Sequence, residues 1–186
     1  MIINEDGDIK IFKPAEKADQ NSEILSFVEG LSHHRQNGNV DKAKELGASI
    51  ALAIYEDTQS DNMNAKGFPQ DHFMQRCALM LFSVEAALNY YLPSQQLSAI
   101  AIDSLHNNIQ EKNLDFYHEI IEGPAFSFYY LGVRKGGDNI PKDIGEAFAM
   151  LCGHTNERGF IEEGKHLYTV VLLDIETKIL NLKFEN

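Results

Sequence analysis

From about residue 21 to residue 182, apolar side chains recur every three or four positions, and polar stretches with glycine or proline separate the runs. This spacing places apolar side chains on one face of an α-helix, whereas a half-buried strand needs strict alternation. The connections are short, so consecutive helices are expected to pack as antiparallel neighbours. The sequence predicts a single all-α domain over residues 21–186, with six or seven helices in antiparallel hairpins, as a compact bundle or a short repeat stack.

Local stop and start signals set the expected helix boundaries. Asn37-Gly38 is a helix C-terminal signal, Pro69 and Pro141 suit a first helical turn, and Gly123-Pro124 should break the fifth helix. We expect helices at about 21–37, 41–55, 69–92, 94–111, 113–135, 141–153 and 160–182. The third is apolar on most faces between residues 77 and 88, which is typical of a helix at the centre of a fold.

The first 20 residues differ from the rest of the chain. Two short β-branched runs flank Asp6-Gly7 within residues 1–12, and this pattern predicts a β-hairpin. Residues 13–20 are polar and are expected to form a linker. An isolated hairpin is marginal in water, so it should pack on the body or pair with another chain.

The charge balance limits the partners that the chain can take. Its 186 residues carry a formal net charge of −12, and the 16 Lys and Arg are scattered along the sequence. Such a chain repels phosphate groups, so we expect neither nucleic acid nor an anionic membrane as a partner. The longest apolar run is too short to span a bilayer and the N-terminus lacks signal-peptide features, so we expect a cytoplasmic protein. Cys77 and Cys152 are expected to be buried thiols in a reducing compartment.

Two stretches resemble helical repeats. Residues 31–51 contain Leu31, the run Asn37-Gly38-Asn39-Val40-Asp41-Lys42-Ala43 and Leu46, and are similar to the turn and second helix of a tetratricopeptide unit. Residues 125–147 contain Ala125, Leu131-Gly132, Gly136-Gly137, Ile140, Asp143 and Ala147, and resemble a Sel1-type repeat, although the Leu-Gly to Asp distance is one residue short. The resemblance covers about a third of the chain. It implies an interaction scaffold without catalytic residues.

Carboxylate–histidine pairs raise a metal hypothesis. A carboxylate precedes a histidine by three residues, on one helix face, at Asp103/His106, Asp115/His118 and Glu163/His166. Di-iron bundles use such pairs together with single glutamates from other helices, and Glu85 and Glu122 stand in the corresponding order along the chain. The alternative metal site would therefore comprise Glu85, Asp103, His106, Glu122, Glu163 and His166. The simpler interpretation is that these are surface ion pairs that add little stability.

Glu85 lies in the most apolar helix and needs an explanation of its own. Ionised carboxylates are almost never buried without a partner. Either its face is exposed, or it pairs with a cation such as Arg76, Lys112 or Arg134.

The segment from residue 129 to 137 combines aromatic rings, two cations and a glycine-rich loop, and the aromatic stretch at 126–130 is the most plausible contact surface. Tyr129, Tyr130, Arg134 and Lys135 are the candidate binding residues, because such a mixture suits a peptide or an anionic ligand. The simpler interpretation is a helix C-terminus with favourable cations. No motif predicts a catalytic residue or a cofactor. The leading hypothesis is a non-catalytic protein-interaction or adaptor domain; the alternatives are a metal-dependent bundle enzyme and a self-associating protein, with a homodimer possible.

Overall fold

The computed structural model describes residues 17–59, 70–112, 115–135 and 139–185, and these ranges form eight helices and no strand. The helices are α1 (Lys17–Gln36), α2 (Asn39–Gln59), α4 (Gln70–Tyr91), α5 (Gln95–Glu111), α6 (Asp115–Glu122), α7 (Ala125–Lys135), α8 (Ile140–Leu151) and α9 (Arg158–Leu182). The all-α prediction is confirmed. The predicted hairpin at residues 1–12 lies outside the described residues. The first helix begins at Lys17, so the expected linker was drawn too long.

Local chemistry explains several of the helix ends. Gly38 and Gly153 follow α1 and α8 with φ of 77°, a left-handed conformation that glycine adopts without strain. The Oγ atom of Ser94 accepts a hydrogen bond from the backbone N–H of Leu97 at 3.3 Å and so caps α5. As predicted, the chain breaks at Gly123-Pro124, and the expected fifth helix is divided into α6 and α7.

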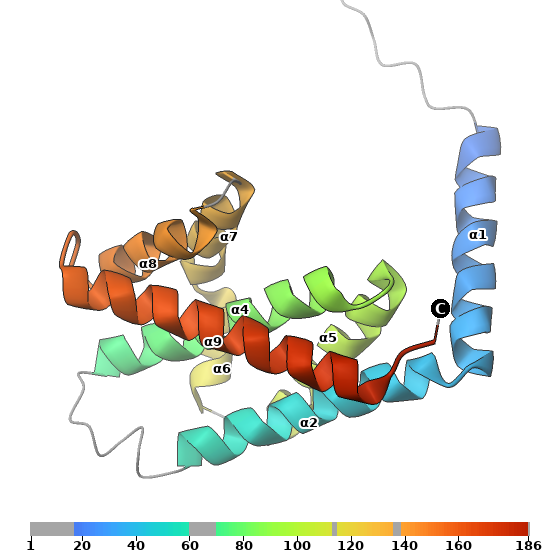
Figure 1. The fold of residues 1–186 in the computed structure, drawn as a ribbon, viewed down its shortest axis with the longest axis horizontal. Coiled ribbons are helices and arrows are strands. Elements are labelled where there is room, and N and C mark those ends of the chain that lie inside the picture. Colours follow the sequence, from blue (N-terminus) through green and yellow to red (C-terminus); the bar gives the residue numbers. More distant parts are fainter. Residues whose placement is uncertain (1–16, 60–69, 113–114, 136–138, 186) are drawn as a thin grey trace, which may run out of the picture.

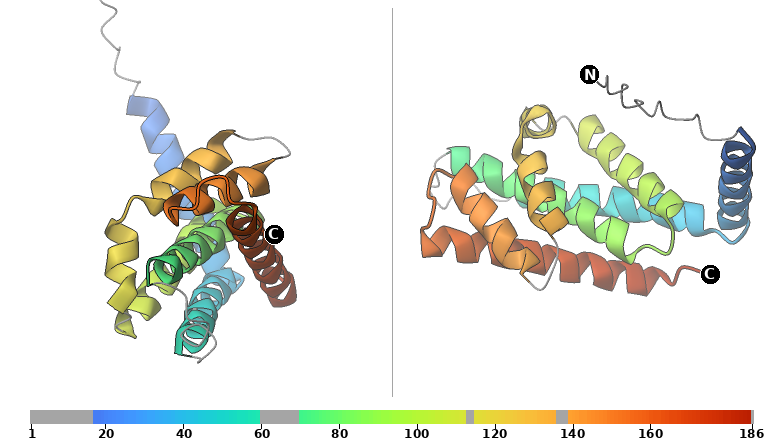
Figure 2. Two further views of the ribbon diagram at one scale, coloured as in Figure 1. Left: turned by 90° about the vertical axis from the view of Figure 1, so that its left-hand side faces the viewer. Right: turned by 90° about the horizontal axis from the view of Figure 1, so that it is seen from above.

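The third expected helix, α4, is the central element of the bundle. It contacts α5, α6, α7, α8 and α9. Figure 1 and Figure 2 show α4 with α9 along one side and α7 and α8 standing over it. Side chains on several faces of α4 are fully buried, including Cys77, Leu81 and Leu88, which confirms the prediction made from its apolar sequence. Within the described ranges, no helix has the length and apolarity needed to cross a membrane.

The expectation that consecutive helices pair throughout the chain is wrong. The most extensive contacts of α2 are with α5, and those of α4 are with α9. A close approach explains the first pair: a Cβ added to Gly47 would lie 2.2 Å from the Ala101 carbonyl oxygen and 2.8 Å from the Leu105 nitrogen. Only a residue without a side chain allows the α2 and α5 backbones to lie this close. Consecutive helices do contact each other in the pairs α1–α2, α4–α5, α7–α8 and α8–α9.

The pair formed by α8 and α9 is also built around glycine. A Cβ on Gly145 would lie 2.3 Å from the Ile161 carbonyl oxygen, and a Cβ on Gly164 would lie 2.6 Å from Cβ of Phe148. Phe148 is fully buried at this crossing. Two small residues, one on each helix, therefore hold α8 against α9 and fix the position of the α7–α8 pair above the rest of the bundle.

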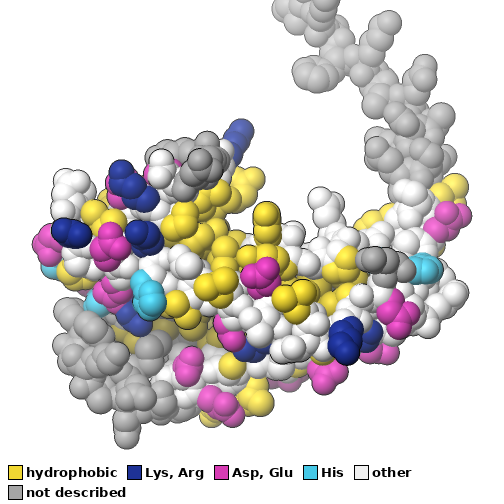
Figure 3. Space-filling view, viewed as in Figure 1, with side chains coloured by type: hydrophobic (Ala, Val, Ile, Leu, Met, Phe, Trp, Pro, Cys, Tyr) yellow, Lys and Arg dark blue, Asp and Glu magenta, His cyan; other side chains and the backbone are white. Residues whose placement is uncertain are grey.

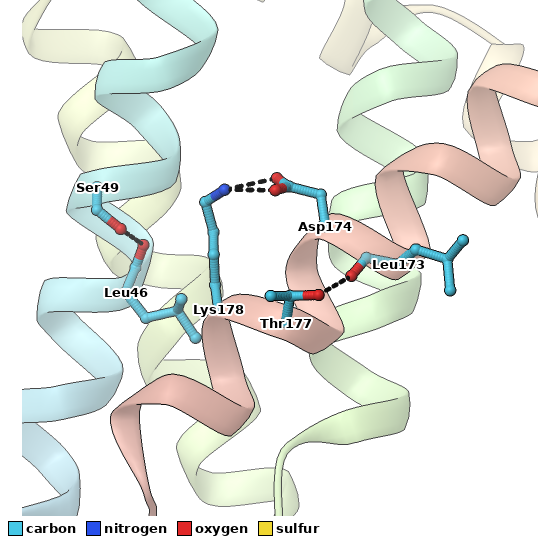
Figure 4. A network of polar contacts seen from close by, with 6 residues as sticks. All are labelled: Leu46, Ser49, Leu173, Asp174, Thr177 and Lys178. Carbon is cyan, nitrogen blue, oxygen red and sulfur yellow. Dashed lines mark hydrogen bonds and ion pairs between the residues drawn. The ribbon is translucent and has the colours of Figure 1, made fainter.

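Polar contacts fasten the end of the chain to the start of α2. The buried Asn39 donates from Nδ2 to the Glu185 carbonyl oxygen at 2.6 Å, and its Oδ1 accepts from the Glu185 backbone N–H at 3.0 Å. Away from this end, each bond drawn in Figure 4 joins two residues of the same helix, such as Lys178 and Asp174 of α9 at 2.6 Å. The two Asn39 bonds join the start of α2 to the residues that follow α9.

The first helix stands apart from the body. Its main contacts are with α2 and α5, and Figure 1 shows it rising from one end of the bundle, on the same side as α7 and α8. Gln96 of α5 fixes its direction, because Nε2 donates to the Phe27 carbonyl oxygen at 2.9 Å. The Gln96 side chain also lies against Gly30, where an added Cβ would come within 3.0 Å of it.

Candidate functional site

An apolar groove of about 1060 Å³ lies between α4, α7, α8 and α9. Its wall comes from all four helices and is mostly aromatic and aliphatic. The space-filling view in Figure 3 shows hydrophobic side chains gathered where α7 and α8 stand over α4 and α9. Its lining side chains include Glu85 and Tyr90 of α4, Phe126, Tyr130 and Leu131 of α7, and Leu172 of α9. A concave apolar surface with few polar groups is the usual form of a binding site.

The rotation of α7 decides which of its aromatic side chains reach the groove. Ala125, Tyr129 and Gly132 lie on the inner face, and Gly132 comes so close to α8 that an added Cβ would meet Ile144 Cδ1 at 3.3 Å. Tyr130 is turned by about 100° from Tyr129 along the helix and is 61% exposed. The two neighbouring tyrosines therefore have different roles.

The prediction that Tyr129 belongs to a contact surface is wrong. Its side chain is fully buried, and its ring packs against Phe82 with centroids 5.4 Å apart. Its hydroxyl has no hydrogen-bond partner among the described residues, and burial raises its pKa. Tyr129 is a core residue that supports the floor of the groove. Tyr130, in contrast, lines the groove, and its role in binding stays a prediction.

The other two predicted binding residues lie at the end of α7. Arg134 is exposed and does not line the groove. Only the backbone of Lys135 is described, at the last position of the helix. The structure thus brings one of the four predicted residues, Tyr130, into the groove wall.

The rim of the groove carries exposed apolar side chains from two helices. Tyr90 of α4 is 79% exposed, and Leu131 of α7 is 53% exposed. Tyr90 and Tyr91 meet edge to face with ring centroids 4.9 Å apart. Large apolar side chains grouped around a concavity are typical of interaction surfaces and ligand-binding grooves.

Glu85 is the carboxylate of the groove wall, and its partner is a histidine. Its Oε1 lies 2.9 Å from His106 Nε2, and His106 Nδ1 lies 2.6 Å from the Tyr117 hydroxyl. A neutral His106 with its proton on Nε2 satisfies both bonds, because Nε2–H donates to Glu85 and the Tyr117 hydroxyl donates to Nδ1. Burial raises the pKa of Tyr117, which keeps that hydroxyl a donor. The carboxylate therefore enters the groove already hydrogen-bonded.

None of the three cations expected as partners holds Glu85. Arg76 forms an ion pair with Glu163, Lys112 lies over the Tyr55 ring with Nζ 4.6 Å from the centroid, and Arg134 is exposed. That interpretation anticipated a partner but named the wrong side chains.

A second polar cluster joins α4 to α9 beneath α8. His72 Nε2 lies 3.1 Å from Glu163 Oε2, and Arg76 pairs with the other oxygen of the same carboxylate. His72 is buried, with the Phe160 ring at 5.2 Å. Burial, and then the positive charge of Arg76, lowers the pKa of His72. The ring is therefore uncharged at neutral pH and donates its Nε2–H to Glu163, which makes this cluster a clamp between two helices.

The residues of the metal hypothesis are distributed between these two clusters. Glu85 and His106 meet, whereas Glu163 bonds to His72 and not to His166, which is exposed. Asp103 and Glu122 are exposed as well. In the part of the chain that the structure describes, no group of three or more His, Cys, Asp or Glu side chains is arranged to hold a metal ion.

The two thiols lie near the second cluster. Burial raises the pKa of Cys77 to about 12 and that of Cys152 to about 11. Cys77 is buried, as expected, whereas Cys152 is only half-buried, at the C-terminal end of α8. Both are free, and thiols of such high pKa are poor nucleophiles.

Sequence reasoning missed most of the groove wall. Tyr90, Tyr91, Tyr168 and Leu172 were not predicted as site residues, because each fits the apolar pattern of its own helix. The Tyr90-Tyr91 pair at the end of α4 is a sequence signal for an exposed aromatic side chain, because two adjacent residues of a helix cannot both face the core.

The comparisons with known proteins returned no similar protein. No family model, no curated protein and no solved structure matches the chain.

Proposed function

We propose that the chain is a protein-interaction module, without catalysis of its own, that holds an apolar segment of a protein partner in the groove between α4, α7, α8 and α9. The observation that carries this proposal is the combination of a large apolar concavity with exposed apolar side chains on its rim. The partial resemblance of residues 31–51 and 125–147 to tetratricopeptide and Sel1-type repeats stays a prediction, and it agrees with the same class of function.

The rim favours a protein segment over a small ligand. Tyr90, Tyr130 and Leu131 are each more than half exposed, so the apolar surface continues outward past the concavity. An extended occupant such as an amphipathic helix covers both the groove and its rim. Each of these side chains contributes about 1–3 kcal/mol to binding when it is fully covered.

The polar groups of the groove do not oppose an apolar occupant. The Glu85 carboxylate already accepts a hydrogen bond from His106. An apolar occupant that covers Glu85 therefore buries a carboxylate that keeps a hydrogen-bond partner. Burial of a charge without such a partner would be the main free-energy cost of covering an acid. Of the other polar side chains in the wall, Asn89 accepts a hydrogen bond from the Ser98 hydroxyl, and Ser127 lies on α7. The rest of the wall is mostly aromatic and aliphatic, and aromatic side chains are enriched at the centres of protein interfaces.

Site-specific photocrosslinking tests the proposal. A benzoylphenylalanine placed at Tyr130 should capture a defined partner segment from cells that express the protein. The same probe at Leu180, a 68% exposed residue at the far end of α9, is the matched control and should capture nothing defined.

The binding affinity of the purified captured segment then measures how much a groove side chain contributes. Leu131→Asp should weaken its affinity by about tenfold or more, and Leu180→Asp should leave it unchanged. Identical adducts from both probe positions, or equal affinities for the two variants, would contradict the proposal.

A further inference from the structure

One oxygen of the Glu85 carboxylate is left for a molecule that enters the groove. Glu85 is the single charged side chain among the described residues that line the groove. Its Oε1 accepts the hydrogen bond from His106, and the Glu85 side chain is 25% exposed. No other described residue hydrogen-bonds to this carboxylate, so Oε2 is bonded by water until an occupant replaces that water. An occupant that brings a hydrogen-bond donor to Oε2 avoids the free-energy cost of removing this water.

The carboxylate is held in place by side chains of two other helices. His106 of α5 donates from Nε2 to Glu85 at 2.9 Å, and the hydroxyl of Tyr117 on α6 donates to His106 Nδ1 at 2.6 Å. A side chain that is already fixed in this way loses little conformational freedom when a partner binds to it. Glu85 is therefore a preorganised acceptor in the wall of the groove.

The surroundings of the groove are negatively charged as well. Burial, and then the negative charge of Glu176 on α9, raises the pKa of Tyr91, so Glu176 lies close to this part of the wall. Lys178, two residues farther along α9, pairs with Asp174 at 2.6 Å, and the exposed Arg134 does not line the groove. The whole chain has a net charge of −12. Such a charge distribution attracts a cationic partner and repels an anionic one.

The aromatic part of the wall suits the same kind of partner. Tyr90 and Tyr130 line the groove and are 79% and 61% exposed, so their rings are accessible to an occupant. The face of a tyrosine ring attracts an ammonium or guanidinium group. The apolar stem of a lysine or arginine packs along such a surface while its charged end reaches an acceptor. A basic side chain can therefore use both the rings and the Glu85 carboxylate, whereas a neutral apolar side chain uses the rings alone.

We propose that the protein segment held in the groove is a basic amphipathic helix, in which a lysine or arginine pairs with Glu85 and the flanking apolar side chains cover Tyr130 and Leu131. The inference rests on the proposed function, because it names the chemistry of the occupant of the same groove. The ion pair with Glu85 fixes the position of the helix along the groove, and the apolar contacts supply most of the affinity. Because charges contribute to the contact, added salt weakens the binding.

Selection from a displayed library of random peptides tests this chemistry. Peptides of about 16 residues, or four helical turns, are selected on the immobilised full chain at about 0.15 M salt, and in parallel on Glu85→Gln. The wild type should enrich peptides with a lysine or arginine between apolar residues at helical spacing, and Glu85→Gln should not enrich the basic position. Glu56→Gln is the matched control, because it removes the same charge from an exposed position of α2, outside the groove. This control should select the same peptides as the wild type.

Calorimetric titration of the most enriched peptide then tests the pair with Glu85. Replacing its basic residue by norleucine, which is uncharged and of similar length, should weaken binding to the wild type by about tenfold or more. The two peptides should bind Glu85→Gln with similar affinities, because the basic residue has lost its partner there. The norleucine exchange leaves the protein unchanged, so its result does not depend on the stability of Glu85→Gln. Equal affinities of the two peptides for the wild type would overturn the inference.

The inference and the proposed function can fail separately. Leu131→Ser keeps the net charge and should weaken binding of the selected peptides by about tenfold or more. If Leu131→Ser weakens the binding but the selected peptides are neutral or acidic, the inference fails and the proposed function stands. If the selected peptides bind Leu131→Ser as tightly as the wild type, they do not bind in the groove, which contradicts the proposed function. A selection that yields no peptide above background overturns the inference, and capture by the probe at Tyr130 then decides the proposed function.

Discussion

Replacing Gly47 by alanine should destabilise the protein, although alanine is the better helix former. The exchange gains about 1 kcal/mol of helix propensity. The added Cβ, however, would lie 2.2 Å from the Ala101 carbonyl oxygen and 2.8 Å from the Leu105 nitrogen, and both are backbone atoms that cannot rotate away. Ordinary contact begins near 3.4 Å, so α2 and α5 must separate by roughly 1 Å along their most extensive contact.

Overpacking of this kind lowers the free energy of unfolding by about 1–3 kcal/mol. We expect Gly47→Ala to lie at the upper end of this range, because two whole helices must move apart. After the gain in propensity, the expected net loss is about 2 kcal/mol, which lowers the melting temperature by about 4–8 °C for a chain of this size. Calorimetry and urea unfolding measure both quantities.

Gly159→Ala in α9 is the matched control for this prediction. A Cβ at position 159 meets no atom within 4 Å, so the variant should be as stable as the wild type or up to about 1 kcal/mol more stable. If Gly47→Ala proved as stable as Gly159→Ala, the close approach of α2 and α5 would be refuted.

Three further predictions concern groups with perturbed pKa values or buried bonds. Burial, and then Arg76, lowers the pKa of His72, so the unfolded chain binds a proton at this side chain more readily than the folded chain does. The free energy of unfolding should therefore fall as the pH drops below about 6.5, and it should fall more steeply in the wild type than in His72→Asn. Equal pH slopes for the two proteins in urea unfolding would contradict this. Cys77, with its pKa of about 12, should resist iodoacetamide at about pH 8 until urea unfolds the chain, and rapid native labelling would contradict its burial. Tyr117→Phe removes the donor to His106 Nδ1 and should cost about 1 kcal/mol of unfolding free energy, whereas an unchanged value would exclude that bond.

Features set by neighbouring residues were predictable from the sequence. The break at Gly123-Pro124 follows from the geometry of proline within one turn. The central position of α4 follows because a segment apolar on every face can be satisfied only by neighbours on every side. The burial of Tyr129 is also predictable, since Ala125 and Gly132 stand four and three residues away on its face. Composition alone does not separate Tyr129 from Tyr130, because both belong to the same aromatic run.

Features that join distant segments were not predictable. The contact of α2 with α5 depends on Gly47, and a glycine in a helix does not reveal which backbone comes near it. The partner of Glu85 is His106, across the turn between α4 and α5, whereas local spacing suggested that His106 would pair with Asp103. Helix-face rules describe neighbours on one helix, and here the bonds between helices were formed instead.

The account depends most on the groove as the place where an apolar protein segment binds. Methyl NMR of the full chain tests this directly, with the segment captured by the probe at Tyr130 added to saturation. The account predicts that the methyl signals of Leu131, Ile140 and Leu172 shift together, while those of the exposed Leu52 and Leu180 do not. Shifts confined to Leu52 or Leu180, with the three groove signals unmoved, would contradict it.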